Sequence, residues 1–94
     1  MVLNNINIHE DVIKYIVTLL RDKFSIDIDS NTKRGENFFG SNIGISAKDM
    51  IYLLYLSEQR YNICFEENEI GSLSFFTLDG LSDSIVKHMK NMVR

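Results

Sequence analysis

Apolar side chains recur three and four residues apart in two parts of the chain, near its beginning and near its end. This spacing places them on one face of a helix, and it predicts helices over His9–Phe24 and Leu78–Met92. The first helix has acidic residues near its start and basic residues near its end, an order that the helix dipole favours. Its apolar positions are Val12, Ile13, Ile16, Val17, Leu19, Leu20 and Phe24.

A further helix is predicted in the middle of the chain. Ser46 and Asp49 have the spacing of a capping box, in which a serine oxygen and an acidic side chain accept hydrogen bonds from backbone N–H groups at a helix start. Every residue from Met50 to Leu56 is apolar or tyrosine. Such a helix must be flanked by other elements, or it must use part of its surface for docking. We expect it to end near Tyr61.

The intervening segments predict loops and one short helical turn. Ile26 and Ile28 alternate with polar residues, which we interpret as an extended loop anchored by two isoleucines. Ser30–Asn37 is the most polar part of the chain and is expected to be solvent-exposed, while Glu66–Gly71 is expected to form the short turn. The pattern predicts an all-α fold in a single domain, residues 1–94. We expect a four-helix bundle of three main helices and one short helix, with a long first connector.

Composition excludes several classes of protein. The chain has 94 residues, of which 45% are hydrophobic, so it can bury one core. A net charge of −3 without a long basic run argues against nucleic acid as a partner. No apolar stretch approaches membrane-spanning length, and the N-terminus lacks the order of a signal peptide, so we expect a cytoplasmic protein. Cys64, the single cysteine, is expected to be a small buried hydrophobe.

Residues that carry chemistry are sparse. His9 and His88 have no cysteine or second histidine at ligand spacing, so no metal site is expected, and His88 is interpreted as a residue stabilised by the helix dipole. Glu66–Glu69 lacks the oxygen-rich loop of a calcium site and is interpreted as a solvated turn. No phosphate-binding loop, catalytic triad or paired carboxylates are evident, which favours a protein that is not an enzyme.

The order of the helices, the long connector and the segment Gly44–Tyr61 resemble acyl carrier proteins. Members of that family have a phenylalanine, a leucine-glycine pair, a variable residue, and an Asp-Ser-Leu motif followed by an acidic residue. The corresponding string here is Phe39, Ile43-Gly44, Ile45, Ser46-Ala47-Lys48 and Asp49. The resemblance implies the carrier-type four-helix bundle. It covers most of the chain in pattern, and the middle third in motif.

One departure changes the expected chemistry. In carriers the serine of the motif holds a phosphopantetheine arm, but Ala47 occupies that position and has no hydroxyl. We therefore expect no cofactor, and the chain is most similar to the acyl-carrier-related proteins of bacterial peptide-maturation (bacteriocin-type) systems, which lack this serine. The alternative is a one-residue shift that makes Ser46 the phosphopantetheine site of a functional acyl or peptidyl carrier. That shift sacrifices Gly44 and Asp49 as anchors of the alignment.

The middle helix also supplies the predicted partner-binding residues, Lys48, Ile51, Tyr52 and Tyr55. This helix is nearly neutral and aromatic, so recognition should depend on tyrosine and apolar contacts. The resemblance implies a protein partner, namely a peptide-modifying, acyl-transfer or synthase-type enzyme. A third alternative is a small helical regulator that binds protein or nucleic acid without carrier ancestry. An exposed tyrosine face suits a monomer awaiting its partner and a homodimer equally well.

Overall fold

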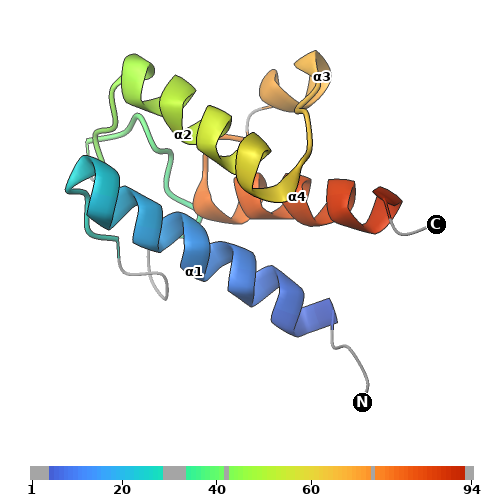
Figure 1. The fold of residues 1–94 in the computed structure, drawn as a ribbon. Coiled ribbons are helices and arrows are strands. Elements are labelled where there is room, and N and C mark those ends of the chain that lie inside the picture. Colours follow the sequence, from blue (N-terminus) through green and yellow to red (C-terminus); the bar gives the residue numbers. More distant parts are fainter. Residues whose placement is uncertain (1–4, 29–33, 42, 73, 93–94) are drawn as a thin grey trace.

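The computed structural model describes residues 5–28, 34–41, 43–72 and 74–92, with side chains between residues 8 and 91. Within this part of the chain there are four helices and no strand, as predicted (Figure 1). They are α1 (Asn5–Phe24), α2 (Ala47–Tyr61), α3 (Glu67–Ile70) and α4 (Leu78–Met92). The first helix begins four residues earlier than predicted. Its first turn precedes the apolar residues from which the helix was predicted.

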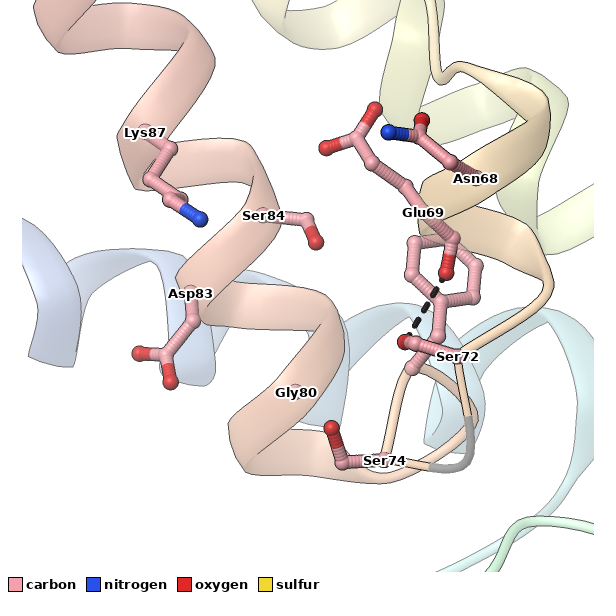
Figure 2. A pocket seen from close by; sticks show the side chains of 9 residues that line it. Asn68, Glu69, Ser72, Ser74, Gly80, Asp83, Ser84 and Lys87 are labelled. Carbon is pink, nitrogen blue, oxygen red and sulfur yellow. Dashed lines mark hydrogen bonds between the residues drawn. The ribbon is translucent and has the colours of Figure 1, made fainter.

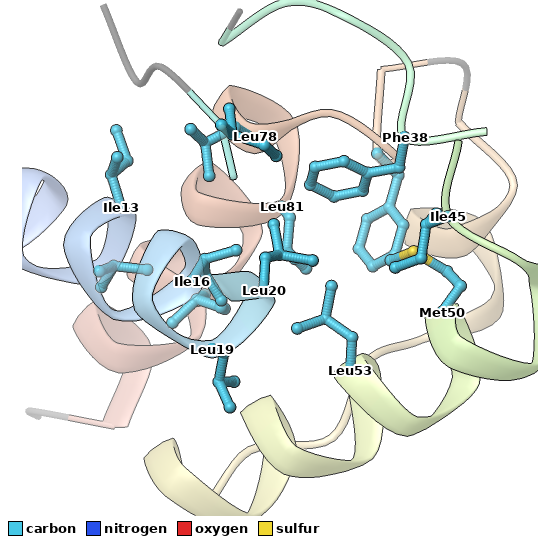
Figure 3. Close-up of a cluster of buried hydrophobic side chains, with 14 of the residues drawn as sticks. Ile13, Ile16, Leu19, Leu20, Phe38, Ile45, Met50, Leu53, Leu78 and Leu81 are labelled. Atoms are coloured by element: carbon cyan, nitrogen blue, oxygen red, sulfur yellow. The ribbon is translucent and has the colours of Figure 1, made fainter. Parts of the chain in front are cut away.

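The three long helices pack around one core. α1 contacts α4 most extensively, and α2 packs against both of them (Figure 1). α1 and α2 are antiparallel. The centroids of the Tyr15 and Tyr61 rings are 5.5 Å apart, and those of the Phe24 and Tyr52 rings are 5.8 Å apart, so the end of each helix lies beside the start of the other. The core residues come from all three long helices, from the connector before α2 and from the segments between α2 and α4 (Figure 3). The best buried are Val12, Ile13, Ile16, Leu20, Phe38, Met50, Leu53, Phe75, Leu78, Leu81 and Ile85.

The connector between α1 and α2 contributes to the core and is not merely a solvated loop. Ile28 is buried and Ile26 is partly buried, as predicted. The Phe38 ring is fully buried, and its backbone is fixed by a hydrogen bond from Phe38 N–H to the Phe76 carbonyl, at 2.7 Å. Ile45 N–H in turn donates to the Phe38 carbonyl at 2.9 Å, which aligns the chain for entry into α2.

Arg34 corrects the expectation that the whole of the polar connector is solvated. Its Nε donates to Asp79 Oδ1 at 2.8 Å and its Nη2 to Glu10 Oε2 at 3.1 Å. The Arg34 carbonyl accepts a hydrogen bond from Asp79 N–H at 3.0 Å. The hydrogen bond to Asp79 raises the pKa of the guanidinium further, so Arg34 is a permanent cation that joins the connector to α1 and α4. Residues 30–33 of the predicted connector lie outside the described residues.

Side-chain caps fix the starts of α2 and α4, and the first of them is the predicted Ser46 cap. Ser46 is extended, with φ −80° and ψ 159°, and its Oγ accepts a hydrogen bond from Asp49 N–H at 3.1 Å. Thr77 Oγ1 accepts from Gly80 N–H at 2.9 Å at the start of α4. Both hydrogen bonds satisfy backbone donors that a helix start leaves without an intrahelical partner.

In the segment after α2, one expectation is wrong and another holds only in part. Cys64 is exposed, because Phe65 beside it is buried and successive side chains of an extended segment point in opposite directions. The short helical turn predicted at Glu66–Gly71 is the helix α3, and Glu66, Glu67 and Asn68 are exposed as expected, but Glu69 is largely covered. Glu69 Oε1 accepts a hydrogen bond from Glu66 N–H and contacts His88 Nε2, both at 2.8 Å. His88 therefore links α4 to α3, which is a tertiary contact that the helix dipole does not require.

Candidate functional site

The approach to α2 is built around two glycines. Gly44 has a φ of +72°, in the left-handed region that favours glycine. Its N–H donates to the Gly40 carbonyl at 2.7 Å, and Ile43 N–H donates to the same oxygen at 3.1 Å. This tight turn buries the Ile45 side chain and delivers the next residues to the surface. The first residues of α2 are therefore exposed on a rigid turn.

Ser46 and Ala47, the two candidate attachment positions, lie side by side at this exposed start. Ala47 is the first residue of α2 and presents only a methyl group. The Ser46 hydroxyl is solvent-accessible, but its oxygen already serves as the helix cap. A hydroxyl is thus present one residue before the position at which the carrier motif has it.

The four predicted partner-binding residues share one face of α2, which we call the α2 outer face. It consists of Lys48, Ile51, Tyr52 and Tyr55. Because these positions are three and four residues apart, their side chains lie along one side of the helix. The opposite side carries the buried Met50, Leu53 and Ser57. The structure therefore brings all four residues together and leaves them accessible.

Large apolar groups on this face are unusually exposed for a helix that packs on a core. Ile51 is 70% exposed, Tyr52 46% and Tyr55 53%. Single exposed hydrophobic residues are common on protein surfaces, but adjacent ones indicate a site of interaction. Tyr52 leans toward α1, where its ring edge contacts Phe24. Ile51 and Tyr55 form the more accessible part of the α2 outer face.

Charge at this face is low and arranged by position along the helix. Lys48 is exposed in the first turn of α2, and Glu58 lies in its last turn. One oxygen of that carboxylate, Oε2, accepts a hydrogen bond from Phe65 N–H at 2.8 Å, which fixes the side chain beside the C-terminal end of the helix. The structure thus places a cation and an anion at the two ends of an apolar centre.

Apart from the α2 outer face, the described residues form a cleft between α3 and α4, which the sequence did not indicate. Figure 2 shows Ser84 and Lys87 on α4 facing Asn68 and Glu69 across a polar cleft of about 340 Å³. Its carboxylates already have partners within the chain. Asp83 Oδ1 lies 2.6 Å from His9 Nε2, and Glu69 contacts His88. The first pair joins α1 to α4 and the second joins α3 to α4, so the arrangement needs no ligand to explain it.

Other classes of site find no support in the described part of the chain. No group of three or more histidine, cysteine, aspartate or glutamate residues there could hold a metal ion. None of the described helices is long and apolar enough to cross a membrane. No family model, curated protein or solved structure matches the chain. The candidate function therefore rests on α2 and on the residues at its start.

Proposed function

We propose that this protein is a cytoplasmic, non-enzymatic module related to acyl carrier proteins, without a phosphopantetheine arm. It docks through the α2 outer face onto a peptide-modifying or other acyl-handling enzyme. The observation that carries the proposal is the exposure of Ile51, Tyr52 and Tyr55 on one side of a capped helix. A helix held by the core on one side presents the other side with little loss of conformational entropy on binding.

The chemistry of the face indicates how the partner is recognised. Tyrosine is enriched among residues that dominate binding energy, because it buries a large area and loses little rotamer freedom. Lys48 at the start of α2 and Glu58 near its end carry opposite charges that cancel, so electrostatic steering contributes little to its association. The partner surface should offer an apolar pocket for Ile51 and Tyr55. Binding should depend only weakly on salt concentration.

A functional carrier modified at Ser46 is the second candidate. The exposure of the Ser46 hydroxyl at the start of α2 favours it, since an anionic phosphodiester is compatible with the positive end of the helix dipole. Ala47, at the position of the attachment serine in the carrier motif, argues against it. The two candidates differ in one observable, which is the presence of the covalent arm.

Intact-mass measurement after coexpression with a broad-specificity phosphopantetheinyl transferase tests the proposal. We expect the unmodified mass for the wild-type chain, with an ordinary acyl carrier protein as the positive control for the transferase. A mass increase of one phosphopantetheine arm that disappears in Ser46→Ala would replace the proposal with the second candidate. Ala47→Ser tests the register of the carrier motif, because modification of that variant alone would support carrier ancestry.

A further inference from the structure

We infer that the α2 outer face also pairs with a second copy of this chain, as an antiparallel helix pair in which Lys48 of each copy meets Glu58 of the other. The inference uses the same surface as the proposed function, but it does not rest on that function. It concerns the protein alone and is tested without any partner enzyme.

The positions along α2 form a seam suited to helix pairing. Lys48, Ile51, Tyr55 and Glu58 are separated by three, four and three residues, which is the spacing of core positions in a two-helix coiled coil. The two central members are apolar or aromatic and highly exposed. The two outer members carry opposite charges. The seam therefore has an apolar centre between a cation and an anion.

The order of the charges selects the direction of pairing. In a parallel pair, Lys48 would face Lys48 of the other copy and Glu58 would face Glu58, which is unfavourable at both ends. A two-fold axis midway between Ile51 and Tyr55 reverses one helix. Each Lys48 then faces Glu58 of the other copy, and each Ile51 faces Tyr55. A single two-fold operation thus satisfies all four layers, as an isologous interface requires.

The contacts within one copy leave the charged groups available. Lys48 and Glu58 are ten residues apart on a helix, about 15 Å along its axis, so they cannot pair within one chain. Glu58 uses Oε2 for the hydrogen bond with Phe65 N–H, which holds the carboxylate in place and leaves Oε1 for an external donor. The Tyr52 ring, against Phe24, lies beside the seam and extends the covered apolar area.

The size of the contact predicts a weak association. α2 has 15 residues, and a pair of such helices covers less than the roughly 1,200 Å² of total surface that typifies stable complexes. We expect a dimer that forms at high protein concentration and dissociates on dilution. Because Ile51 and Tyr55 are covered in it, self-pairing competes with docking of any other protein on the same face.

Sedimentation velocity between about 10 μM and 1 mM tests the inference through charge reversal. We expect the wild type to dimerise reversibly over this range, and K48E and E58K each to raise the dissociation constant by about tenfold or more, because each makes both outer layers like-charged. An equimolar mixture of K48E and E58K should dimerise again, since every outer layer then has opposite charges. A monomeric wild type at 1 mM, a dimer insensitive to K48E, or a mixture that stays monomeric would overturn the inference.

Two further measurements keep the test independent of folding defects. E58K removes the acceptor for Phe65 N–H, so circular dichroism must first establish that its helical content and melting temperature match those of E58Q. Ile51→Ser provides a second variant, because Ile51 is mostly exposed and its loss should abolish dimerisation without unfolding the chain.

Carbodiimide cross-linking should join Lys48 to Glu58 in the dimer fraction, a linkage that only two copies can make. Cross-linked dimers without that linkage would contradict the antiparallel pairing.

Discussion

Gly80 offers a prediction in which sequence and structure disagree on the sign. It lies in the first turn of α4, where replacing glycine with alanine ordinarily stabilises a helix by about 1 kcal/mol. A Cβ at this position, however, would lie 1.8 Å from the Ser74 carbonyl oxygen and 2.6 Å from its carbon. These are backbone atoms, which cannot rotate aside as the end of a side chain can. Gly80→Ala should therefore destabilise the protein.

The magnitude follows from what must move. Thr77 Oγ1 donates to the Ser74 carbonyl at 2.8 Å and accepts from Gly80 N–H at 2.9 Å, so displacing residues 74–77 weakens both hydrogen bonds. Their loss costs about 0.5–1.5 kcal/mol each, and overpacking costs about 1–3 kcal/mol. After subtracting the gain of about 1 kcal/mol in helix propensity, we expect a net loss of roughly 3 kcal/mol in the free energy of unfolding.

Urea unfolding followed by circular dichroism measures this loss. A thermal scan should show the midpoint lowered by roughly 12 to 24 °C, from about 4–8 °C per kcal/mol in a domain of this size. Gly35→Ala is the matched control, because no atom lies within 4 Å of its added Cβ, and it should change stability by less than about 0.5 kcal/mol. A Gly80→Ala variant as stable as the wild type, or more stable, would refute the close approach of residue 74 to α4.

Three more predictions concern α2 and the contact between α3 and α4. Leu53→Ala should lower the free energy of unfolding by about 2–5 kcal/mol, whereas Tyr55→Ala should lower it by less than about 1 kcal/mol, because the first side chain is buried and the second is half exposed. Ser46→Ala should cost about 1 kcal/mol through loss of the cap, measured in the same urea titration. Stability should fall below about pH 4.5 in part through Glu69, and Glu69→Gln should remove that part of the pH dependence.

The sign of the pH effect follows from the surroundings of Glu69. Partial burial raises the pKa of the carboxyl, but hydrogen bonds from Glu66 N–H and His88, with the nearby charges of His88 and Lys87, outweigh burial and hold the pKa below its ordinary value. A lowered pKa contributes stability that is fully present above the unfolded-state value and is lost as the pH falls through the folded-state value. Identical pH profiles for Glu69→Gln and wild type would show that the pair with His88 contributes no stability.

The other two predictions would be contradicted by the following changes in the free energy of unfolding. If Tyr55→Ala and Leu53→Ala destabilised the protein equally, Tyr55 would belong to the core and could not be part of an accessible face. A Ser46→Ala variant with unchanged stability would mean that the Asp49 N–H finds another acceptor, and the serine would then have no structural role at the start of α2.

The helices were predictable because their determinants are local. Apolar residues spaced three and four apart located α1 and α4. The pair Ser46 and Asp49, only three residues apart, located the start of α2 ahead of a continuous apolar run. Patterns within one turn of a helix suffice for such features.

Contacts between distant segments were not predictable. Arg34 joins residues 24 and 45 positions away, and the contact of Glu69 with His88 spans 19 positions. Only the packing of α4 against the rest of the chain brings these groups together. The same packing makes Gly80 favourable. Glycine destabilises an isolated helix, but here its missing Cβ lets the backbone of Ser74 approach α4.

For the candidate site, the exposure of its residues is observed and their docking role stays a prediction. Lys48, Ile51, Tyr52 and Tyr55 are all exposed, because a helix with apolar groups all round must leave some of them uncovered. The proposed pairing of Lys48 with Glu58 of a second copy depends on the helix boundaries and on the position of the Glu58 carboxylate, neither of which the sequence fixes. The identity of a partner depends on a second surface, which one chain does not encode.

The central claim is that the α2 outer face binds a protein, and a quantitative capture experiment tests it most directly. Tagged wild-type chain, an Ile51→Ser/Tyr55→Ser variant and the exposed α1 control Lys14→Ser would each be incubated with an extract of the native cells. Bound proteins would then be quantified by mass spectrometry. We predict that an acyl-handling or peptide-modifying enzyme is retained by the wild type and Lys14→Ser, and is lost from the double variant. Equal retention of that enzyme by the double variant would contradict the claim.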